Sequence, residues 1–196
     1  FATGMTPMIG ADNGTGNIKG IGITVKNGLM TNGIIGGISI ILLTIIYFCL
    51  DHFGQAPALM PYIKPYFAII GTSTLFALGF NVLKQFTDGI CRPMISMTLL
   101  MIGNLLNIFG NWVLIYGKLG FPEMGLTGAG ISTLVSRALI LLVFVVFIFK
   151  SKKMNEYARA IKEALLSRGE MKTVFKMGYP VGIQMALESS TFTFAA

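Results

Sequence analysis

Three asparagines lie inside one apolar segment of this chain, where polar side chains could form a binding site. The segment runs from Met94 to Tyr116, 23 residues without a charge, which is about 34 Å as a helix and enough to cross a bilayer. Asn104, Asn107 and Asn111 are spaced by three and four residues, so they share one helical face. An amide without partners is costly at the depth of hydrocarbon, so this face must meet protein or a watery cavity.

The spacing leaves two interpretations of that face open. One is hydrogen bonding between helices, at about 0.6 kcal/mol per contact. The other is a site for a ligand or an ion, because polar groups inside a membrane commonly mark pathways. Gly103 and Gly110 flank the asparagines and would let a second helix approach closely in either case.

Glu188 is the single acidic residue that we place within an apolar segment, GYPVGIQMALESSTFTF. A carboxylate costs about 3 kcal/mol or more there on insertion scales. Because desolvation favours the neutral carboxyl, Glu188 is suited to carry a proton or to meet a cation. The alternative is a hydrogen-bonded glutamate that ties helices together.

The sequence lacks the catalytic motifs that are typical of hydrolases and ATPases. His52 is the only histidine and is predicted to be solvated, and there is no HExxH or Walker motif. Cys49 and Cys91 are predicted at opposite ends of the spans, unpaired and without metal-ligand spacing. We expect no enzyme, no cofactor and no resident metal.

The amino-acid composition indicates that these residues lie in membrane-spanning helices. Hydrophobic residues make up 54% of the 196 and charged residues 12%, against about 25% charged in soluble domains. The sequence therefore predicts an all-α polytopic membrane protein in a lipid bilayer. The net charge of +7 is interpreted as cytoplasmic loops and not as nucleic-acid binding.

Four complete spans and two partial ones are predicted. The partial spans end at Ile9 and begin at Met177, and since both chain ends lie in apolar segments we expect a piece of a longer chain. Loops are expected at Gly10–Gly20 and Lys84–Pro93. Pro65 is expected to limit the helix before the second span. The complete spans are predicted at Leu29–Leu50, Tyr66–Val82, Met94–Tyr116 and Gly125–Phe149.

Residues 150–176 differ from the spans, with eight basic and three acidic residues. Apolar residues at helical spacing predict an amphipathic helix over Asn155–Ser167, ended by Gly169, which rests on lipid headgroups as a solvated connector. Successive loops lie on alternate sides of the membrane. Of the basic residues in the loops, only Lys64 and Lys118 then fall on one side. The cytoplasmic side, marked by positive residues, carries twelve: Lys19, Lys26, Lys84, Arg92, Lys150, Lys152, Lys153, Arg159, Lys162, Arg168, Lys172 and Lys176. Arg137 alone lies within a span, where an arginine faces the protein interior and needs a partner.

The ordered set of these segments resembles the multidrug and toxic compound extrusion (MATE, NorM-type) transporters. The resemblance rests on FATGMTPMIGADNGTG, RPMISMTLLMIGNLLNIFGNWVLIYG, GLTGAGIST and GYPVGIQMALES, and it covers essentially the whole chain. It implies twelve helices in two lobes, of which this chain would hold the end of helix two to the start of helix seven. Residues 1–149 would belong to the first lobe, 150–176 to a cytoplasmic connector and 177–196 to the second lobe.

The resemblance also implies a function and a set of site residues. The function would be efflux of drugs or small organic cations across the cell (inner) membrane by a monomeric transporter, through antiport with sodium ions or protons and alternating access. Asn107 and Asn111 match polar positions near a cation or proton site, Thr133 matches a hydroxyl of helix six, and Glu188 matches an acidic residue of helix seven. Several relatives have aspartate where Asn111 stands, and an amide can coordinate sodium but cannot take a proton. With Asn104 on the same face, these are the predicted binding residues, and sodium is expected at Asn107, Asn111 and Glu188.

Two other functions stay open at this point. A related flippase for lipid-linked oligosaccharides would be expected to show a cluster of basic residues lining a cavity, whereas only Arg137 lies within a span. A membrane scaffold without transport would tolerate apolar residues in place of Glu188 and the asparagines.

Overall fold

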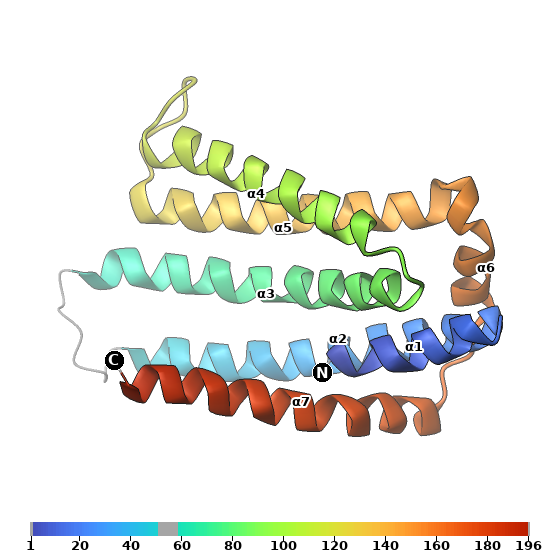
Figure 1. Cartoon of the computed structure of the whole chain (residues 1–196). Coiled ribbons are helices and arrows are strands. Elements are labelled where there is room, and N and C mark those ends of the chain that lie inside the picture. Colours follow the sequence, from blue (N-terminus) through green and yellow to red (C-terminus); the bar gives the residue numbers. More distant parts are fainter. Residues whose placement is uncertain (1, 51–58, 196) are drawn as a thin grey trace. The chain divides into compact units, whose positions relative to one another are not determined.

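Helices make up nearly all of the chain (Figure 1). The computed structural model describes residues 2–50 and 59–195, and no strand occurs among them. The long elements are α1 (Met5–Gly14), α2 (Ile18–Cys49), α3 (Met60–Gly89), α4 (Pro93–Ile115), α5 (Gly125–Lys150), α6 (Asn155–Glu163) and α7 (Arg168–Ala195), with single 3₁₀ turns η1 (Ala2–Gly4) and η4 (Lys152–Met154).

Four helices, α2 to α5, are long and apolar enough to cross a membrane. Less than a third of the residues in their most apolar stretches are buried, and Ile41, Phe48, Met101 and Leu142 are among the exposed ones. Such exposure is costly in water and favourable in hydrocarbon. The fold is therefore that of an all-α polytopic membrane protein, and the prediction of four complete spans is confirmed. Over its described residues α7 is not among these helices, so the predicted fifth span stays a prediction.

The chain divides into two compact units, and α2 to α5 each contribute residues to both. Unit 1 comprises residues 1–32, 81–96 and 146–196, and unit 2 comprises residues 33–80 and 97–145. All twelve basic residues that the sequence assigns to the cytoplasmic side belong to unit 1, whereas Lys64, Lys118 and Arg137 belong to unit 2. The alternation of charge along the sequence thus coincides with the division of the structure.

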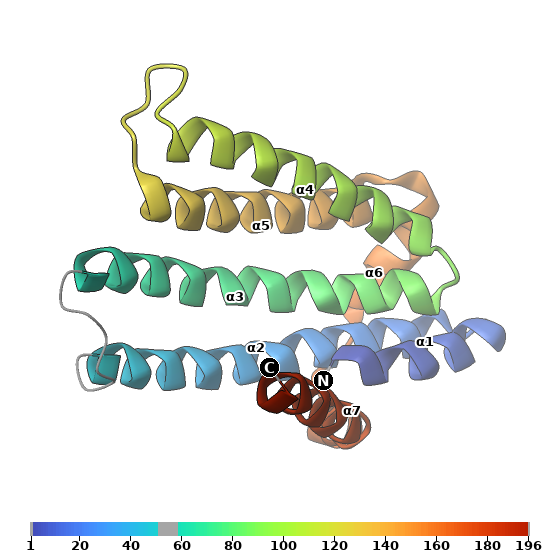
Figure 2. The same cartoon turned by 60° about the vertical axis from the view of Figure 1, so that its left-hand side comes forward.

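Unit 1 has a conventional packed core. Its buried side chains come from α1, α2, α3, α5 and the segments after α5: Met5, Ile9, Ile21, Val25, Val82, Phe86, Ile148, Met154 and Val174. α7 lies against η1 and α1 (Figure 2). At Gly4 a side chain would fall 2.8 Å from the backbone nitrogen of Gly178, so the close approach of η1 to α7 requires glycine.

The loop predicted at Gly10–Gly20 is wrong in its extent, because α1 continues to Gly14 and α2 already begins at Ile18. Only Thr15, Gly16 and Asn17 connect them, with Gly16 at a φ of +71°. Asn17 shapes this turn: its Nδ2 donates to Asp12 Oδ1 (2.9 Å) and its Oδ1 accepts from the Gly20 N–H (3.1 Å). The Gly- and Asn-rich composition suggested a loop, but burial of α1 side chains outweighs this weak preference.

The ends of α3 also differ from the prediction. α3 begins at Met60 and contains Pro65, six residues in, where the missing N–H removes a single intrahelical bond at the start of the helix. At its other end it runs to Gly89, so Lys84 and Asp88 are helical and form an ion pair at 2.9 Å. The true connection to α4 is residues 90–92, a turn in which Cys91 adopts a φ of +58°. Cys49 and Cys91 are both free, as predicted.

The connector is a packed part of unit 1. α6 ends at Glu163, earlier than predicted, and Gly169 does not break a helix, because α7 begins at Arg168. The apolar face of α6 is buried through Ala158 and Ile161, and the Tyr157 ring meets Phe86 edge to face at 5.7 Å. This face therefore packs on protein and not on headgroups, while Arg159 and Lys162 are exposed.

Two adjacent side chains of α2 hold the segment between α6 and α7, residues 164–167. Lys26 Nζ donates to the carbonyl of Ala164 at 2.6 Å and to that of Lys162 at 3.3 Å. The side chain of Asn27 is fully buried; its Nδ2 donates to Leu165 O (3.3 Å) and its Oδ1 accepts from Ser167 N–H (2.9 Å). We call this pair, Lys26 and Asn27, the connector clamp.

We expect Asn27→Ala to loosen the connector. The change leaves the Ser167 N–H without its partner, and an unmade hydrogen bond of this kind costs about 1–3 kcal/mol. Trypsin should cut the purified protein at Lys162 and Arg168 several times faster than in wild type. Thr173→Ala, which removes an exposed hydroxyl bonded to its own helix, is the matched control. Unchanged cleavage in Asn27→Ala would show that the clamp does not restrain the segment.

In unit 2, α4 lies alongside α5, as Figures 1 and 2 both show. A side chain at Gly110 would overlap Ser132, one at Gly103 would overlap Ile140, and one at Gly128 would fall 2.7 Å from Leu114 O. The close approach predicted for Gly103 and Gly110 is therefore confirmed, with α5 as the partner helix. This contact brings the asparagine face of α4 to the start of α5.

Candidate functional site

Two of the three asparagines meet a hydroxyl of α5 in unit 2. Asn107 Nδ2 donates to Thr133 Oγ1 at 3.3 Å, and Asn111 Nδ2 donates to Asn107 Oδ1 at 3.3 Å. Ser132 Oγ donates to the Asn107 main-chain carbonyl at 3.0 Å, which fixes the register of the two helices. The structure thus brings together Asn107, Asn111 and Thr133, which we call the amide cluster.

One atom of the amide cluster lacks a partner. Asn111 Oδ1 is buried and accepts no hydrogen bond, the one such side-chain atom found in the described part of the chain. Leaving a buried acceptor unpaired costs about 1–3 kcal/mol, and such a group calls for an explanation, for which an ion is one candidate. An amide oxygen is a hard ligand of the type that alkali and alkaline-earth cations accept, so the cluster fits a small cation.

The structure shows no hydrogen bond between this cluster and the other described site residues that were predicted, Asn104 and Glu188. Asn104, one turn earlier on α4, is exposed. Glu188 belongs to unit 1, on the second half of α7, where it is exposed and its Oε1 accepts from Gln184 Nε2 at 3.0 Å. Glu188 is therefore described as a candidate in its own right. His52 lies outside the described residues.

Arg137, whose partner the sequence does not reveal, is bonded to α3. Its Nη1 donates to Ser73 Oγ at 2.8 Å, and Ser73 is fully buried. Ser73 Oγ also donates to Ile70 O at 2.7 Å, and Thr72 and Thr74 bond to carbonyls of the same helix. Arg137 follows Thr133 by one turn of α5, so it lies on the same side of that helix as the amide cluster.

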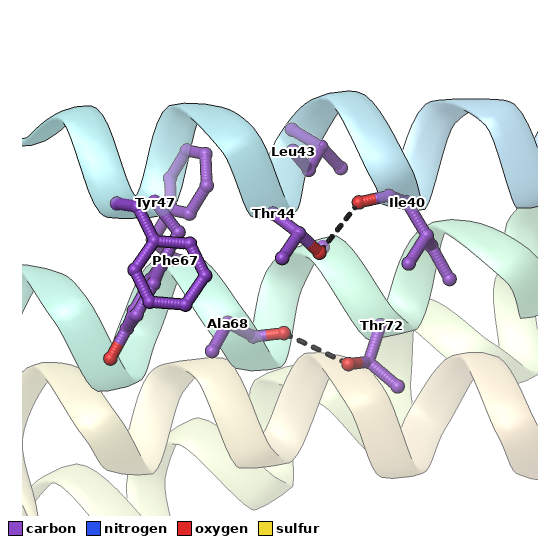
Figure 3. Close-up of a pocket in the computed structure, with 9 residues that line it drawn as sticks. Ile40, Leu43, Thr44, Tyr47, Phe67, Ala68 and Thr72 are labelled. Carbon is purple, nitrogen blue, oxygen red and sulfur yellow. Dashed lines mark hydrogen bonds between the residues drawn. The ribbon is translucent and has the colours of Figure 1, made fainter.

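Unit 2 also contains an open pocket between α2 and α3 that the sequence analysis missed (Figure 3). Its volume is about 270 Å³, and Tyr47, Phe48 and Phe67 supply aromatic walls. The hydroxyls of Thr44 and Thr72 bond to the carbonyls of Ile40 and Ala68, as Figure 3 shows, so the pocket offers mainly apolar surface. None of the predicted site residues lines it.

The chain matches a known protein family over most of its first three spans. The family model described as MatE matches residues 1–113, more than half of the chain. The chain belongs to the MatE family. The match includes Asn107 and Asn111 on α4, two of the three residues of the amide cluster, whereas Thr133 on α5 lies beyond it.

Relatives support the MatE assignment over nearly the full chain. The chain is 29% identical over 198 residues to the multidrug resistance protein NorM of Photobacterium profundum, which covers 98% of this chain and 42% of the relative. It is 27% identical to the protein of the same name from Vibrio cholerae, again with 98% and 42% covered. The chain thus spans less than half the length of these MatE relatives.

Solved MatE-type structures have the same fold. A MATE transporter in a bent conformation matches with a TM-score of 0.81 at 21% identity, covering 97% of this chain and 42% of that one. A multidrug resistance MATE transporter of the MOP superfamily in an inward-facing conformation matches with a TM-score of 0.78, also at 21% identity, covering 91% and 40%. The resemblance stated from the ordered motifs is confirmed.

Proposed function

We propose that the full-length protein exports small organic cations by antiport with sodium ions or protons, through alternating access. The observation that carries this proposal is the unpartnered Asn111 Oδ1 of the amide cluster, inside a span of a MatE-family chain. Two relatives that match the chain along nearly its whole length are named multidrug resistance proteins. Glu188, the acidic residue of α7, supplies the second coupling group.

The amide cluster and Glu188 would have different roles in ion binding, because their side chains differ in chemistry. Amide and hydroxyl oxygens of Asn107, Asn111 and Thr133 can ligate a sodium ion but cannot exchange a proton near neutral pH. A carboxylate such as that of Glu188 can ligate a sodium ion, and it can also take up a proton, which neutralises its charge. Binding of the ion favours one orientation of the transporter by as much as its affinity differs between the two orientations. This difference couples ion entry to cargo export.

We further propose the placement of the chain in the cell. The twelve basic residues of unit 1 favour a cytoplasmic position for this unit in the inner membrane. Residues 1–149 would then belong to the first lobe of a two-lobe monomer, residues 150–176 to the cytoplasmic connector, and residues 177–196 to the second lobe.

Export from sealed vesicles tests the function. The full-length protein is reconstituted in vesicles loaded with ethidium, an inward sodium gradient or an inward proton gradient is imposed, and loss of internal ethidium is followed. We expect export under at least one gradient, and the effective gradient names the coupling ion. If neither gradient drives export, the antiport proposal fails, and an assay of lipid headgroup flipping then tests the flippase alternative.

A further inference from the structure

Arg137 is a fixed positive charge near the middle of a membrane span. It is the thirteenth residue of the 26-residue helix α5, about 18 Å from the start of the helix. A guanidinium stays protonated under all physiological conditions. An uncompensated charge at this depth is expensive, so such residues pair with an opposite charge or line a polar pathway.

The helices of unit 2 contain no opposite charge. No aspartate or glutamate occurs in their described residues 33–49, 60–80, 97–115 and 125–145. The partner that the structure shows for Arg137 is the neutral hydroxyl of Ser73. This bond uses one of the five guanidinium N–H donors and neutralises none of the charge.

The positive charge of Arg137 lies close to the amide cluster on α5. One turn along α5, Thr133 is bonded to Asn107, which in turn accepts from Asn111. A bare cation bound at the amide cluster would be repelled by a guanidinium one turn away. An anionic group beside Arg137 would supply a counter-charge that the described helices of unit 2 lack. A carboxylate matches the geometry of the guanidinium N–H donors, which are arranged as a fork.

We propose that Arg137 is a specificity-determining residue that binds an anionic group, a carboxylate, of the transported molecule. Ser73 orients the guanidinium for this contact by accepting from Nη1. The cargo class is then zwitterionic: an organic cation that also carries a carboxylate is preferred over the same cation without one. The inference deepens the proposed export function and rests on it for the identity of the cargo.

Two dyes that differ only in the relevant group provide the test. Rhodamine 110 is a zwitterion with a benzoate, and rhodamine 123 is its methyl ester, a simple cation. Binding to the purified full-length protein is followed by fluorescence anisotropy at neutral pH. We expect wild type to prefer rhodamine 110, and Arg137→Gln to weaken its binding about tenfold, the range of a close charge pair. Binding of rhodamine 123 should change less than about twofold, since its ester offers the guanidinium no carboxylate to pair with.

Matched variants separate recognition from structure. Arg137→Lys keeps the charge and should retain the preference for rhodamine 110, while Ser73→Ala should weaken it only a few-fold because the charge remains. Lys118→Gln removes another positive charge of unit 2, in the connection after α4, and should change neither affinity. Equal losses for both dyes in Arg137→Gln, or no loss for either, would overturn the proposal.

Binding of the two dyes to the wild-type protein alone is a further test of the proposal. Tighter binding of rhodamine 123 than of rhodamine 110 by wild type contradicts it, even if Arg137→Gln does not fold. Dye binding needs no ion gradient, so it is independent of the ethidium assay. Loss of gradient-driven export with the dye preference intact would reject antiport and leave the anion site standing.

Discussion

Replacing Glu188 by glutamine is expected to abolish most ion-driven export while leaving the protein folded and inserted. The amide keeps the size of the side chain and can still accept from Gln184 Nε2, the bond seen at 3.0 Å. It cannot ionise, so it neither releases a proton nor attracts a cation by charge. We expect the rate of ethidium export in vesicles to fall at least about tenfold, in the range that intramembrane coupling carboxylates justify.

The control for this variant is the acidic residue in the first turn of the same helix. Glu170→Gln removes a carboxylate near the start of α7, where its contribution to the helix is at most about 1 kcal/mol, and export should stay within about twofold of wild type. Expression level and thermal midpoint of Glu188→Gln should match wild type. An export rate equal to that of wild type would remove Glu188 from the coupling mechanism.

The number of spans and the asparagine face could be predicted from the sequence because both depend on local pattern. Hydropathy over about 20 residues reflects the thickness of a bilayer. The spacing of Asn107 and Asn111 reflects the turn of a helix, and Gly103 and Gly110 mark a close helix contact. The structure adds what the pattern leaves open, namely that α5 is the helix in contact.

Helix ends were predicted poorly for a physical reason. Glycine, asparagine and proline weaken a helix by a few kcal/mol at most, and burial of neighbouring side chains outweighs this. Thus Gly10 and Gly14 remain in α1, whose Met5 and Ile9 are fully buried, and Pro65 remains in α3.

Contacts between distant positions were missed because no local signal marks them. Ser73 and Arg137 are 64 residues apart, and Asn27 and Ser167 are 140 apart. Hydroxyls such as those of Thr72, Ser73 and Thr74 commonly bond to carbonyls of their own helix, and these do. Only the structure shows that Ser73 also accepts from an arginine. An amide next to a lysine at the start of a span, as in Lys26 and Asn27, is a signal that could have indicated the connector clamp.

Asn111→Leu is expected to reduce sodium-driven export strongly without destabilising the protein. The side chain leaves its Oδ1 buried and unpaired, so wild type already bears the cost of a desolvated acceptor. Replacing such a group by an apolar one of similar branching is near neutral or stabilising. The lost hydrogen bond to Asn107, at 3.3 Å, offsets this by about 1 kcal/mol. We therefore expect a thermal midpoint in sodium-free buffer equal to wild type or higher.

The effect of sodium itself distinguishes a ligand from a packing residue. An ion that binds only the folded protein raises the thermal midpoint, so sodium should stabilise wild type but not Asn111→Leu. The control is Ser39→Ala, which removes a hydroxyl of α2 bonded to the Ile35 carbonyl of its own helix, and sodium should stabilise it as well. Sodium-driven ethidium export by Asn111→Leu should fall about tenfold or more, the effect of losing about 1.4 kcal/mol of ion affinity. Asn111→Asp restores an oxygen ligand, adds a proton-binding group and should make export respond to a proton gradient. If Asn111→Leu is destabilised and still exports at the wild-type rate, the amide cluster is a packing contact and its free oxygen is no ion ligand.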